Sequence, residues 1–206
     1  MKLAIFDFDS TLMDGETLEI LSKETAYAEK IKEITNNAMK GELDFFESLS
    51  ARVLYLKGLS VRKVNEICNN LPVMNGAEET VFELKKRGYK VVCFSGGFKN
   101  ATIPFAEKLK LDGEFSNILH SKSGVLTGYA GGEMMFGESK GDMLKKLQKL
   151  LNIPIEDTIT IGDGANDLSM FKYSGIRIAF RAKPILEAEA DIKIREKDLK
   201  KLLEFI

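Results

Sequence analysis

The chain has 206 residues, of which 44% are hydrophobic, and its 30 basic and 31 acidic residues give a formal net charge of −1. This length and apolar content predict one large domain or a core with a modest insert. The balanced charge gives no electrostatic footprint for nucleic acid, and no apolar run approaches the ~20 residues that span a bilayer.

The cysteines and the N-terminus indicate the compartment. Cys68 and Cys93 stand far apart and form neither a metal-binding spacing nor a disulfide framework. The apolar part of the N-terminal MKLAIFDFDS is too short for a signal peptide. We therefore expect a reduced, cytoplasmic setting. The sequence leaves the oligomeric state open between monomer and dimer.

Short apolar runs without helical length predict buried β-strands. These runs are LAIFDF at 3–8, YKVVCFSGG at 89–97, DTITIGDG at 157–164, GIRIAF at 175–180 and, more weakly, ADIKI at 190–194. The first three end in unusual polar or glycine-rich segments.

Helical patterns separate these strands. Residues 76–88 end in basic residues and a glycine, and residues 139–152 carry an apolar stripe at helical spacing. Ser139, with Asp142 three residues later, predicts a capping box at the start of the second of these helices. Strands that alternate with helices indicate βαβ units. We therefore predict an α/β fold with a doubly wound, Rossmann-like parallel sheet.

A long stretch after the first strand breaks this alternation, because residues 15 to about 72 read as successive helices without a strand. It is too long for an ordinary βα loop. We predict a small helical cap at residues 15–73, called the helical insert below, and a catalytic core at residues 1–14 and 74–206. A lid that contributes substrate specificity is the functional interpretation, and a segment that only adds core is the alternative.

Four aspartates end two of the predicted strands: Asp7 and Asp9 follow the first, and Asp163 and Asp167 follow the third. The carboxyl ends of parallel strands meet at one edge of the sheet. Carboxylates gathered there repel one another unless a cation neutralises them, and hard oxygen ligands suit Mg²⁺. Because Mg²⁺ keeps part of its shell for substrate phosphate, the aspartates predict a Mg²⁺ site that handles a phosphate.

Two more features fit a phosphate at this edge. Ser95 and the glycines of FSGGF leave backbone N–H groups and a hydroxyl free to hold phosphate oxygens. Lys140 lies in the first turn of a predicted helix, where the macrodipole disfavours a cation. A phosphate within reach would explain its position, whereas a plain turn and an exposed lysine are the alternatives.

Arg52 lies on an otherwise apolar helix face with Phe45, Leu49 and Leu56. A guanidinium on such a face needs a partner, and a substrate carboxylate fits it as a bidentate acceptor. An internal ion pair, or a side chain that reaches solvent, is the alternative.

These segments resemble the haloacid dehalogenase superfamily of phosphatases, whose four motifs match, in order, DFDST at 7–11, Ser95, Lys140 and GDGAND at 162–167. Together with FSGGF and AKPIL, they are similar to the members that act on phosphoserine, over nearly the whole chain. The resemblance implies that Asp7 is a nucleophile that forms an aspartyl phosphate and that Asp9 is the general acid and base. It also implies that Thr11 ties the loop by hydrogen bonds.

The resemblance implies the remaining site residues as well. The phosphoryl oxygens would be held or oriented by Ser95, Gly96, Lys140 and Asn166. The metal would be held by Asp7, Asp163 and the main-chain oxygen of Asp9, with Asp167 beside it or on it. The rest of O-phosphoserine would meet Glu16 at its ammonium, Arg52 at its carboxylate, and Met39 and Phe45 along the pocket.

The leading hypothesis is Mg²⁺-dependent hydrolysis of O-phospho-L-serine, the last step of L-serine biosynthesis. Another small phosphomonoester, or phosphoryl transfer to homoserine, remains an alternative. A receiver-type signalling domain also has an acid cluster, a Ser/Thr and a Lys, but it lacks a helical insert after the first strand and does not need Asp9.

Overall fold

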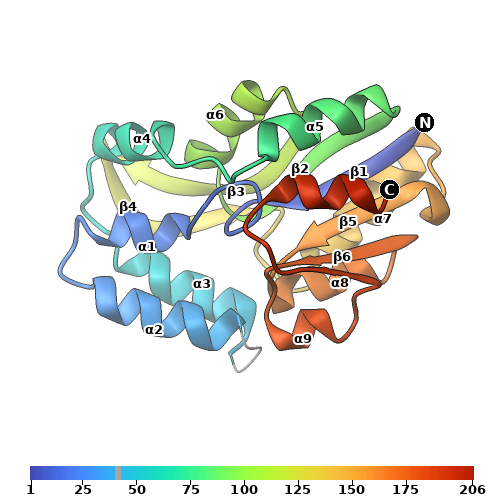
Figure 1. The fold of residues 1–206 in the computed structure, drawn as a ribbon. Helices are drawn as coiled ribbons and strands as arrows, with labels where there is room; N and C mark the ends of the chain where they lie inside the picture. The colour runs from blue at the N-terminus through green and yellow to red at the C-terminus, as the bar shows by residue number, and fades with distance from the viewer. Residues whose placement is uncertain (40–42) are drawn as a thin grey trace.

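The computed structural model describes residues 1–39 and 43–206. A sheet of seven strands, counted over these residues, forms its centre, with the order β4-β3-β2-β1-β5-β6-β7 (Figure 1). The strands are β1 (Lys2–Asp7), β2 (Tyr89–Phe98), β3 (Gly113–Lys122), β4 (Val125–Gly132), β5 (Thr158–Gly162), β6 (Ile176–Phe180) and β7 (Ile192–Ile194). Neighbouring strands are parallel except for β3 and β4, which are antiparallel. The predicted fold class is confirmed.

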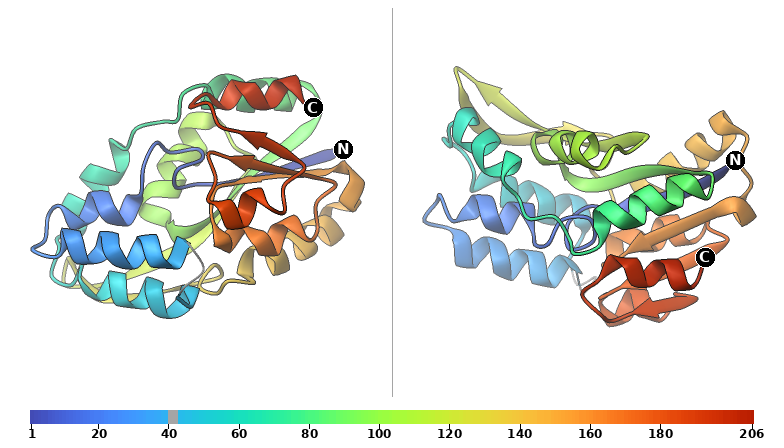
Figure 2. Two further views of the ribbon diagram at one scale, coloured as in Figure 1. Left: turned by 60° about the horizontal axis from the view of Figure 1, so that its bottom comes forward. Right: turned by 45° about the horizontal axis from the view of Figure 1, so that its top comes forward.

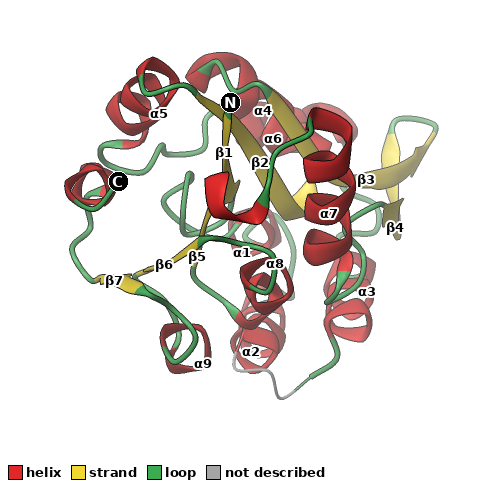
Figure 3. Ribbon diagram, turned by 90° about the vertical axis from the view of Figure 1, so that its right-hand side faces the viewer, coloured by secondary structure: helices red, strands yellow, loops and turns green. Residues whose placement is uncertain are grey.

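Helices cover both faces of the sheet (Figure 3). On one face lie α5 (Ala77–Lys86), α6 (Lys99–Leu109) and the 3₁₀ helix η3 (Leu199–Glu204), and on the other α7 (Ser139–Leu151), α8 (Leu168–Phe171) and α9 (Pro184–Glu187). In β1, Ala4 and Phe6 join the first apolar cluster, and Leu3 and Ile5 join the second. Because both faces are buried, the strand reads as one continuous apolar run.

The helical insert follows β1. Its described part forms α1 (Thr17–Ser22), α2 (Ala28–Met39), α3 (Phe45–Leu54) and α4 (Val61–Asn69). Helices α1, α2 and α3 lie together beyond the end of the sheet at which β1 ends, whereas α4 packs on α6 (Figures 1 and 2). The helical content agrees with the sequence, and the boundaries of a separate cap stay a prediction.

The hairpin of β3 and β4 was not among the predicted strands. Its turn, at Ser123 and Gly124, has φ angles of 52° and 79°, as two-residue hairpin turns require. Beyond the sheet it binds the insert, since Gly58 N donates to Leu126 O at 2.9 Å. Only Ser116, Asn117 and Leu119 of β3 are buried and its last three residues are exposed, so the strand has no continuous apolar run in the sequence.

The start of α7 corrects a second prediction. The helix begins at Ser139 after an N-cap at Glu138, so no capping box forms. Ser139 Oγ instead accepts from Phe136 N at 3.1 Å, and Asp142 pairs with Lys145 at 2.8 Å. Every helix in residues 1–39 and 43–206 is too short or too polar to cross a membrane.

Candidate active site at the carboxyl end of the sheet

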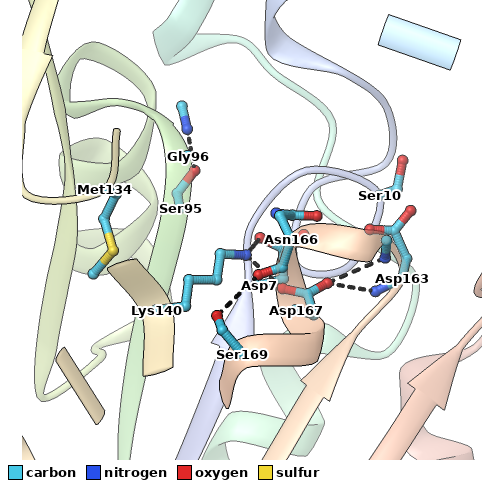
Figure 4. A network of polar contacts seen from close by, with 12 residues as sticks. Asp7, Ser10, Ser95, Gly96, Met134, Lys140, Asp163, Asn166, Asp167 and Ser169 are labelled. Carbon is cyan, nitrogen blue, oxygen red and sulfur yellow. Dashed lines mark hydrogen bonds and ion pairs between the residues drawn. The ribbon is translucent and has the colours of Figure 1, made fainter. Parts of the chain in front are cut away.

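Three buried carboxylates meet where β1 and β5 end (Figure 4). Asp7 is the last residue of β1, Asp163 follows β5, and Asp167 ends the 3₁₀ helix η2 (Ala165–Asp167). Each offers a carboxylate oxygen, and these oxygens lie within 4.8 Å of one another. The structure therefore brings together three of the four aspartates that the sequence singled out.

Lys140 reaches this cluster from the first turn of α7. Its Nζ donates to Asp7 Oδ1, and to Asp167 Oδ1 at 2.6 Å. The side chain is only 3% exposed, which excludes the alternative of a surface lysine. Burial alone would lower its pKa, but the carboxylates of Asp167 and Asp7 outweigh burial and raise it. The ammonium therefore stays charged.

The single ammonium of Lys140 does not balance the three carboxylates of the cluster. Burial, followed by the charge of Asp167, raises the pKa of Asp7 to about 7. Burial and the charge of Asp7 raise the pKa of Asp163 well above its usual range. A cluster of buried oxygen ligands with excess negative charge is the donor set that a hard divalent cation prefers. The residues present therefore fit a divalent metal.

The carboxylate of Asp9 is not part of this group of three. Its Oδ1 accepts from the backbone N of Thr17 at 2.8 Å and from Thr17 Oγ1 at 2.5 Å, at the first residue of α1. Ser10 turns the chain directly after Asp9, with a φ of 59°. The predicted metal role of Asp9 thus depends on its main-chain oxygen. Burial raises its pKa, although the bonds from Thr17 oppose the shift.

Residues 95–97 form a bulge in β2, called the 95–97 bulge. Phe94 pairs with Phe115 on β3 and Phe98 pairs with Asn117, so four steps along β2 match two along β3. Inside the bulge, Ser95 Oγ accepts from Gly97 N at 2.9 Å.

Neighbouring side chains lie close to both glycines of the bulge. A Cβ on Gly96 would lie less than 3.0 Å from the ring of Phe45, and one on Gly97 would lie 3.0 Å from Ser95 Oγ and 3.2 Å from Asp9 Oδ2. The bulge therefore brings bare backbone next to the carboxylates.

A cavity of about 70 Å³ lies between the sheet and the insert. From the core, its lining includes Asp7, Asp9, Gly96, Gly97, Asp163 and Asn166. From the insert, it includes Glu16, Thr17, Thr35, Phe45, Leu49 and Arg52. This volume is small for a ligand pocket, so the cavity suits a small molecule.

Arg52 is buried beside this cavity. Its Nε donates to Ser48 O at 3.2 Å, and its Nη1 to Thr35 Oγ1 at 3.2 Å. No ion pair joins it to a carboxylate in the part of the chain that the structure describes, so an internal ion pair is not observed there. Burial lowers the pKa of the guanidinium, opposed by the charges of Glu16 and Asp9.

Glu16 also lines the cavity. Its Oε1 accepts from Ser10 Oγ at 2.7 Å. Burial, and then the charge of Asp9, raise its pKa to about 8. A buried carboxyl of this kind gains from a cation placed beside it.

Two further residues named from the sequence are Met39 and Thr11. The predicted side-chain contact of Met39 lies outside the described residues. Thr11 Oγ1 is buried without a hydrogen-bond partner among the described atoms, so Thr11 ties the loop through its backbone N, which donates to Phe8 O at 3.3 Å. Sequence reasoning also missed Thr17 and Thr35, because a single threonine in a helical pattern gives no signal of its own.

A family comparison agrees with the order of the motifs. The haloacid dehalogenase-like hydrolase family matches residues 1–175. The chain therefore belongs to the haloacid dehalogenase-like hydrolases. This membership argues against the receiver-domain alternative.

Within that family, the chain is similar over its full length to phosphoserine phosphatases. It is 58% identical over 203 residues to the phosphoserine phosphatase of Wolinella succinogenes, which covers 98% of each chain. A solved phospho-aspartyl intermediate analogue of phosphoserine phosphatase superposes with a TM-score of 0.97 at 48% identity, covering 100% of this chain and 98% of that one. A substrate-bound phosphoserine phosphatase complex gives 0.97 at 47% identity, with the same coverage.

Proposed function

We propose that this protein is a Mg²⁺-dependent phosphatase that hydrolyses O-phospho-L-serine to serine and inorganic phosphate. One observation carries the proposal: a single cavity joins the carboxylates at the ends of β1 and β5 to Glu16 and Arg52 of the insert. The relatives that bear the name phosphoserine phosphatase support the same substrate. This reaction completes the biosynthesis of serine from its phosphate ester.

Each charged group of phosphoserine has a complementary group in the lining of this cavity or, for Ser95 and Lys140, behind that lining. The guanidinium of Arg52 binds the substrate carboxylate, and the carboxylate of Glu16 binds the ammonium. The phosphoryl oxygens are held or oriented by Ser95, Gly96, Lys140 and Asn166. Phe45 packs along the short carbon chain, with Met39 as a further proposed pocket residue.

The first chemical step uses the two aspartates of the first motif. An oxygen of Asp7 attacks phosphorus, and the bond from phosphorus to the serine oxygen breaks. Asp9 gives its proton to that oxygen as serine leaves. The raised pKa of Asp9, caused first by burial, favours the protonated form that this step needs.

The second step returns the enzyme to its starting state. Asp9, now a carboxylate, takes a proton from a water molecule whose oxygen attacks the phosphorus of the aspartyl phosphate. The bond from phosphorus to Asp7 breaks, and inorganic phosphate leaves. In the structure, Thr17 holds Asp9 by two hydrogen bonds.

We assign the metal to Asp7, Asp163 and the main-chain oxygen of Asp9, and we take Mg²⁺ as the ion. When bound, it supplies positive charge that offsets the carboxylates and the transferring phosphoryl group. Asp167 has a different task in this proposal. Its Oδ2 accepts from the backbone N of Asp163 and Gly164 at 3.0 and 3.2 Å, and its Oδ1 holds Lys140.

Two broader assignments follow from the same proposal. Residues 15–73 act as a cap that closes over the substrate, with residues 1–14 and 74–206 as the catalytic core. A reduced cytoplasm is the proposed compartment, in keeping with Cys68 and Cys93, which are buried free thiols.

The test is phosphate release from O-phospho-L-serine with Mg²⁺ and with EDTA. Two further substrates probe the pocket: phosphoethanolamine lacks the carboxylate, and 3-(phosphonooxy)propanoate lacks the ammonium. We expect Mg²⁺-dependent turnover that is fastest with phosphoserine. Turnover of the truncated esters but not of phosphoserine would keep the aspartate chemistry and reject the proposed substrate.

A further inference from the structure

Asn117 of β3 is a fully buried amide next to the proposed phosphate site, with 0% of its surface exposed. Its Nδ2 donates to Gly96 O at 3.0 Å and to Met134 O at 3.1 Å. Its Oδ1 accepts from Met134 N at 2.9 Å. Both amide hydrogens and the acceptor are thus used, a pattern that no other side chain of this size reproduces.

The groups that Asn117 joins belong to two different parts of the proposed phosphate site. Gly96 lies in the 95–97 bulge and lines the cavity. Met134 lies in the segment between β4 and α7, the helix whose first turn carries Lys140. Figure 4 shows Gly96, Met134 and Lys140 around the same site. Asn117 therefore links the bulge by hydrogen bonds to the segment that leads from β4 into α7 and Lys140.

The strand register places Asn117 where this link is needed. It pairs with Phe98, the residue at which β2 rejoins regular pairing after the bulge, and on its other side with Gly132 of β4. A Cβ on Gly132, whose φ is 149°, would lie 2.7 Å from Asn117 Oδ1. The absence of a side chain at Gly132, the last residue of β4, thus leaves room for the Asn117 amide.

We infer that Asn117 is a positioning residue, which fixes the phosphate-binding backbone of the 95–97 bulge relative to Lys140. This inference rests on the proposed function, because it assumes that the bulge and Lys140 hold a phosphoryl group. Removal of the amide donors leaves two buried carbonyls unpaired. The bulge then loses the hydrogen bond from Asn117 that fixes its position relative to the phosphate. The residues proposed to touch phosphate stay unchanged.

Asn117→Asp keeps the shape and the acceptor but replaces the amide donors by a carboxyl oxygen, which also brings negative charge near the phosphate. The uncharged Asn117→Ser therefore separates loss of the donors from that charge. Gln148→Glu is the matched control: it removes the same two donors from a buried amide that binds Thr158 Oγ1 and Tyr173 O, both at 2.9 Å, outside the cavity. Three quantities are measured with Mg²⁺ present: the Kd of inorganic phosphate by calorimetry, kcat/KM for phosphoserine, and Tm.

We expect Asn117→Asp to weaken phosphate binding and to lower kcat/KM by about tenfold or more, because a displaced donor costs part of the about 10²–10³-fold that complete loss of a donor at a developing charge costs. Hydrogen exchange of the amides at residues 96 and 97 accelerates in the same variant. Gln148→Glu lowers Tm but leaves the phosphate Kd within about twofold of wild type. Asn117→Ser, which retains one donor, gives an intermediate phosphate Kd and serves if the Asp variant does not fold.

A purely structural role predicts the opposite pattern. If Asn117→Asp and Asn117→Ser lower Tm while both bind phosphate as wild type does, the inference is wrong. If wild-type protein binds phosphate but does not hydrolyse phosphoserine, the proposed function fails. The phosphate affinities and the exchange rates still decide the role of Asn117 in that case.

Discussion

The rings of Phe46 and Phe136 stack with their centroids 5.1 Å apart and their planes 17° from parallel. Phe46 lies in α3 of the insert, and Phe136 lies in the segment before α7 of the core. The stack therefore joins the insert to the segment before α7. The rings are 40% and 60% exposed, so truncation of either one opens no buried void.

Phe136→Ala should favour a conformation in which the insert covers the cavity less often. An aromatic stack contributes about 1 kcal/mol, so we expect KM for phosphoserine to rise about fivefold with little change in Tm. Phe82→Ala is the control, because Phe82 is 65% exposed on α5 of the core. An unchanged KM in Phe136→Ala, or an equal rise in both variants, would contradict a role in closure.

Thr35→Val removes the hydroxyl that accepts from Arg52 and leaves Arg52 itself in place. Thr35 Oγ1 also donates to Ile31 O at 2.9 Å within α2, so the hydroxyl links the guanidinium to this helix. We expect kcat/KM for phosphoserine to fall about tenfold, since one hydrogen bond to a charged group contributes about 1.5–3 kcal/mol. Phosphoethanolamine, which has no carboxylate, should lose much less. An equal loss for both esters would place the effect outside carboxylate recognition.

Asp9→Asn separates the two chemical steps. An ester with a good leaving group, such as p-nitrophenyl phosphate, needs no proton from Asp9 in the first step, but the second step still needs its base. We expect a burst of nitrophenol followed by turnover about 10²–10⁴-fold slower than wild type, with phosphate trapped on Asp7. Rapid-quench kinetics and mass spectrometry measure both. Steady turnover without a burst would remove Asp9 from the second step.

The sequence predicts best where burial on both faces gives a simple pattern. Leu3 to Phe6 are all buried in the central strand, so an apolar run marks β1 without ambiguity. Asp7 and Asp163 could be placed together because parallel strands end at one edge. The hairpin of β3 and β4 gives no such run, because solvent-exposed residues interrupt both strands.

The residues that sequence reasoning missed act through tertiary contacts. Thr17, Thr35 and Asn117 each hold a group that the sequence did suggest: Asp9, Arg52 and the 95–97 bulge. A lone threonine or asparagine has the same local pattern whether it faces solvent or a buried partner. Only the packing of the insert and the pairing of β3 with β2 show whether such a residue faces solvent or a buried partner.

Asp163→Asn should make the metal-free protein more stable and the metal-bound protein less so. Burial raises the pKa of Asp163 well above its usual range, so its charge opposes folding at neutral pH when no cation is present. We expect a higher Tm than wild type in EDTA, loss of the rise in Tm that Mg²⁺ gives the wild type, and loss of turnover. A lower Tm in EDTA would show that Asp163 stabilises the fold without metal.

The pKa of Asp112 is shifted in the direction opposite to that of Asp163, so its charge stabilises the fold. Its carboxylate accepts from Val91 N at 2.9 Å and pairs with Lys90 at 3.0 Å and Lys85 at 3.3 Å. Burial alone would raise its pKa, but these partners lower it below the usual range. A lowered folded-state pKa stabilises the protein above the unfolded pKa, and this stability is lost as pH falls through the folded pKa.

We therefore expect Asp112→Asn to lower the free energy of unfolding at pH 7 by about 1 kcal/mol, the size of a net hydrogen bond. The difference from wild type should shrink as pH falls below the usual aspartate pKa of about 4, because the wild-type carboxyl then becomes protonated as well. Urea unfolding at neutral and acidic pH measures both values. Asp142→Asn serves as the control, because its pair with Lys145 is 60% exposed on the Asp142 side and contributes little. A deficit in Asp112→Asn that stays constant with pH would mean that the stability comes from the shape of the side chain and not from its charge.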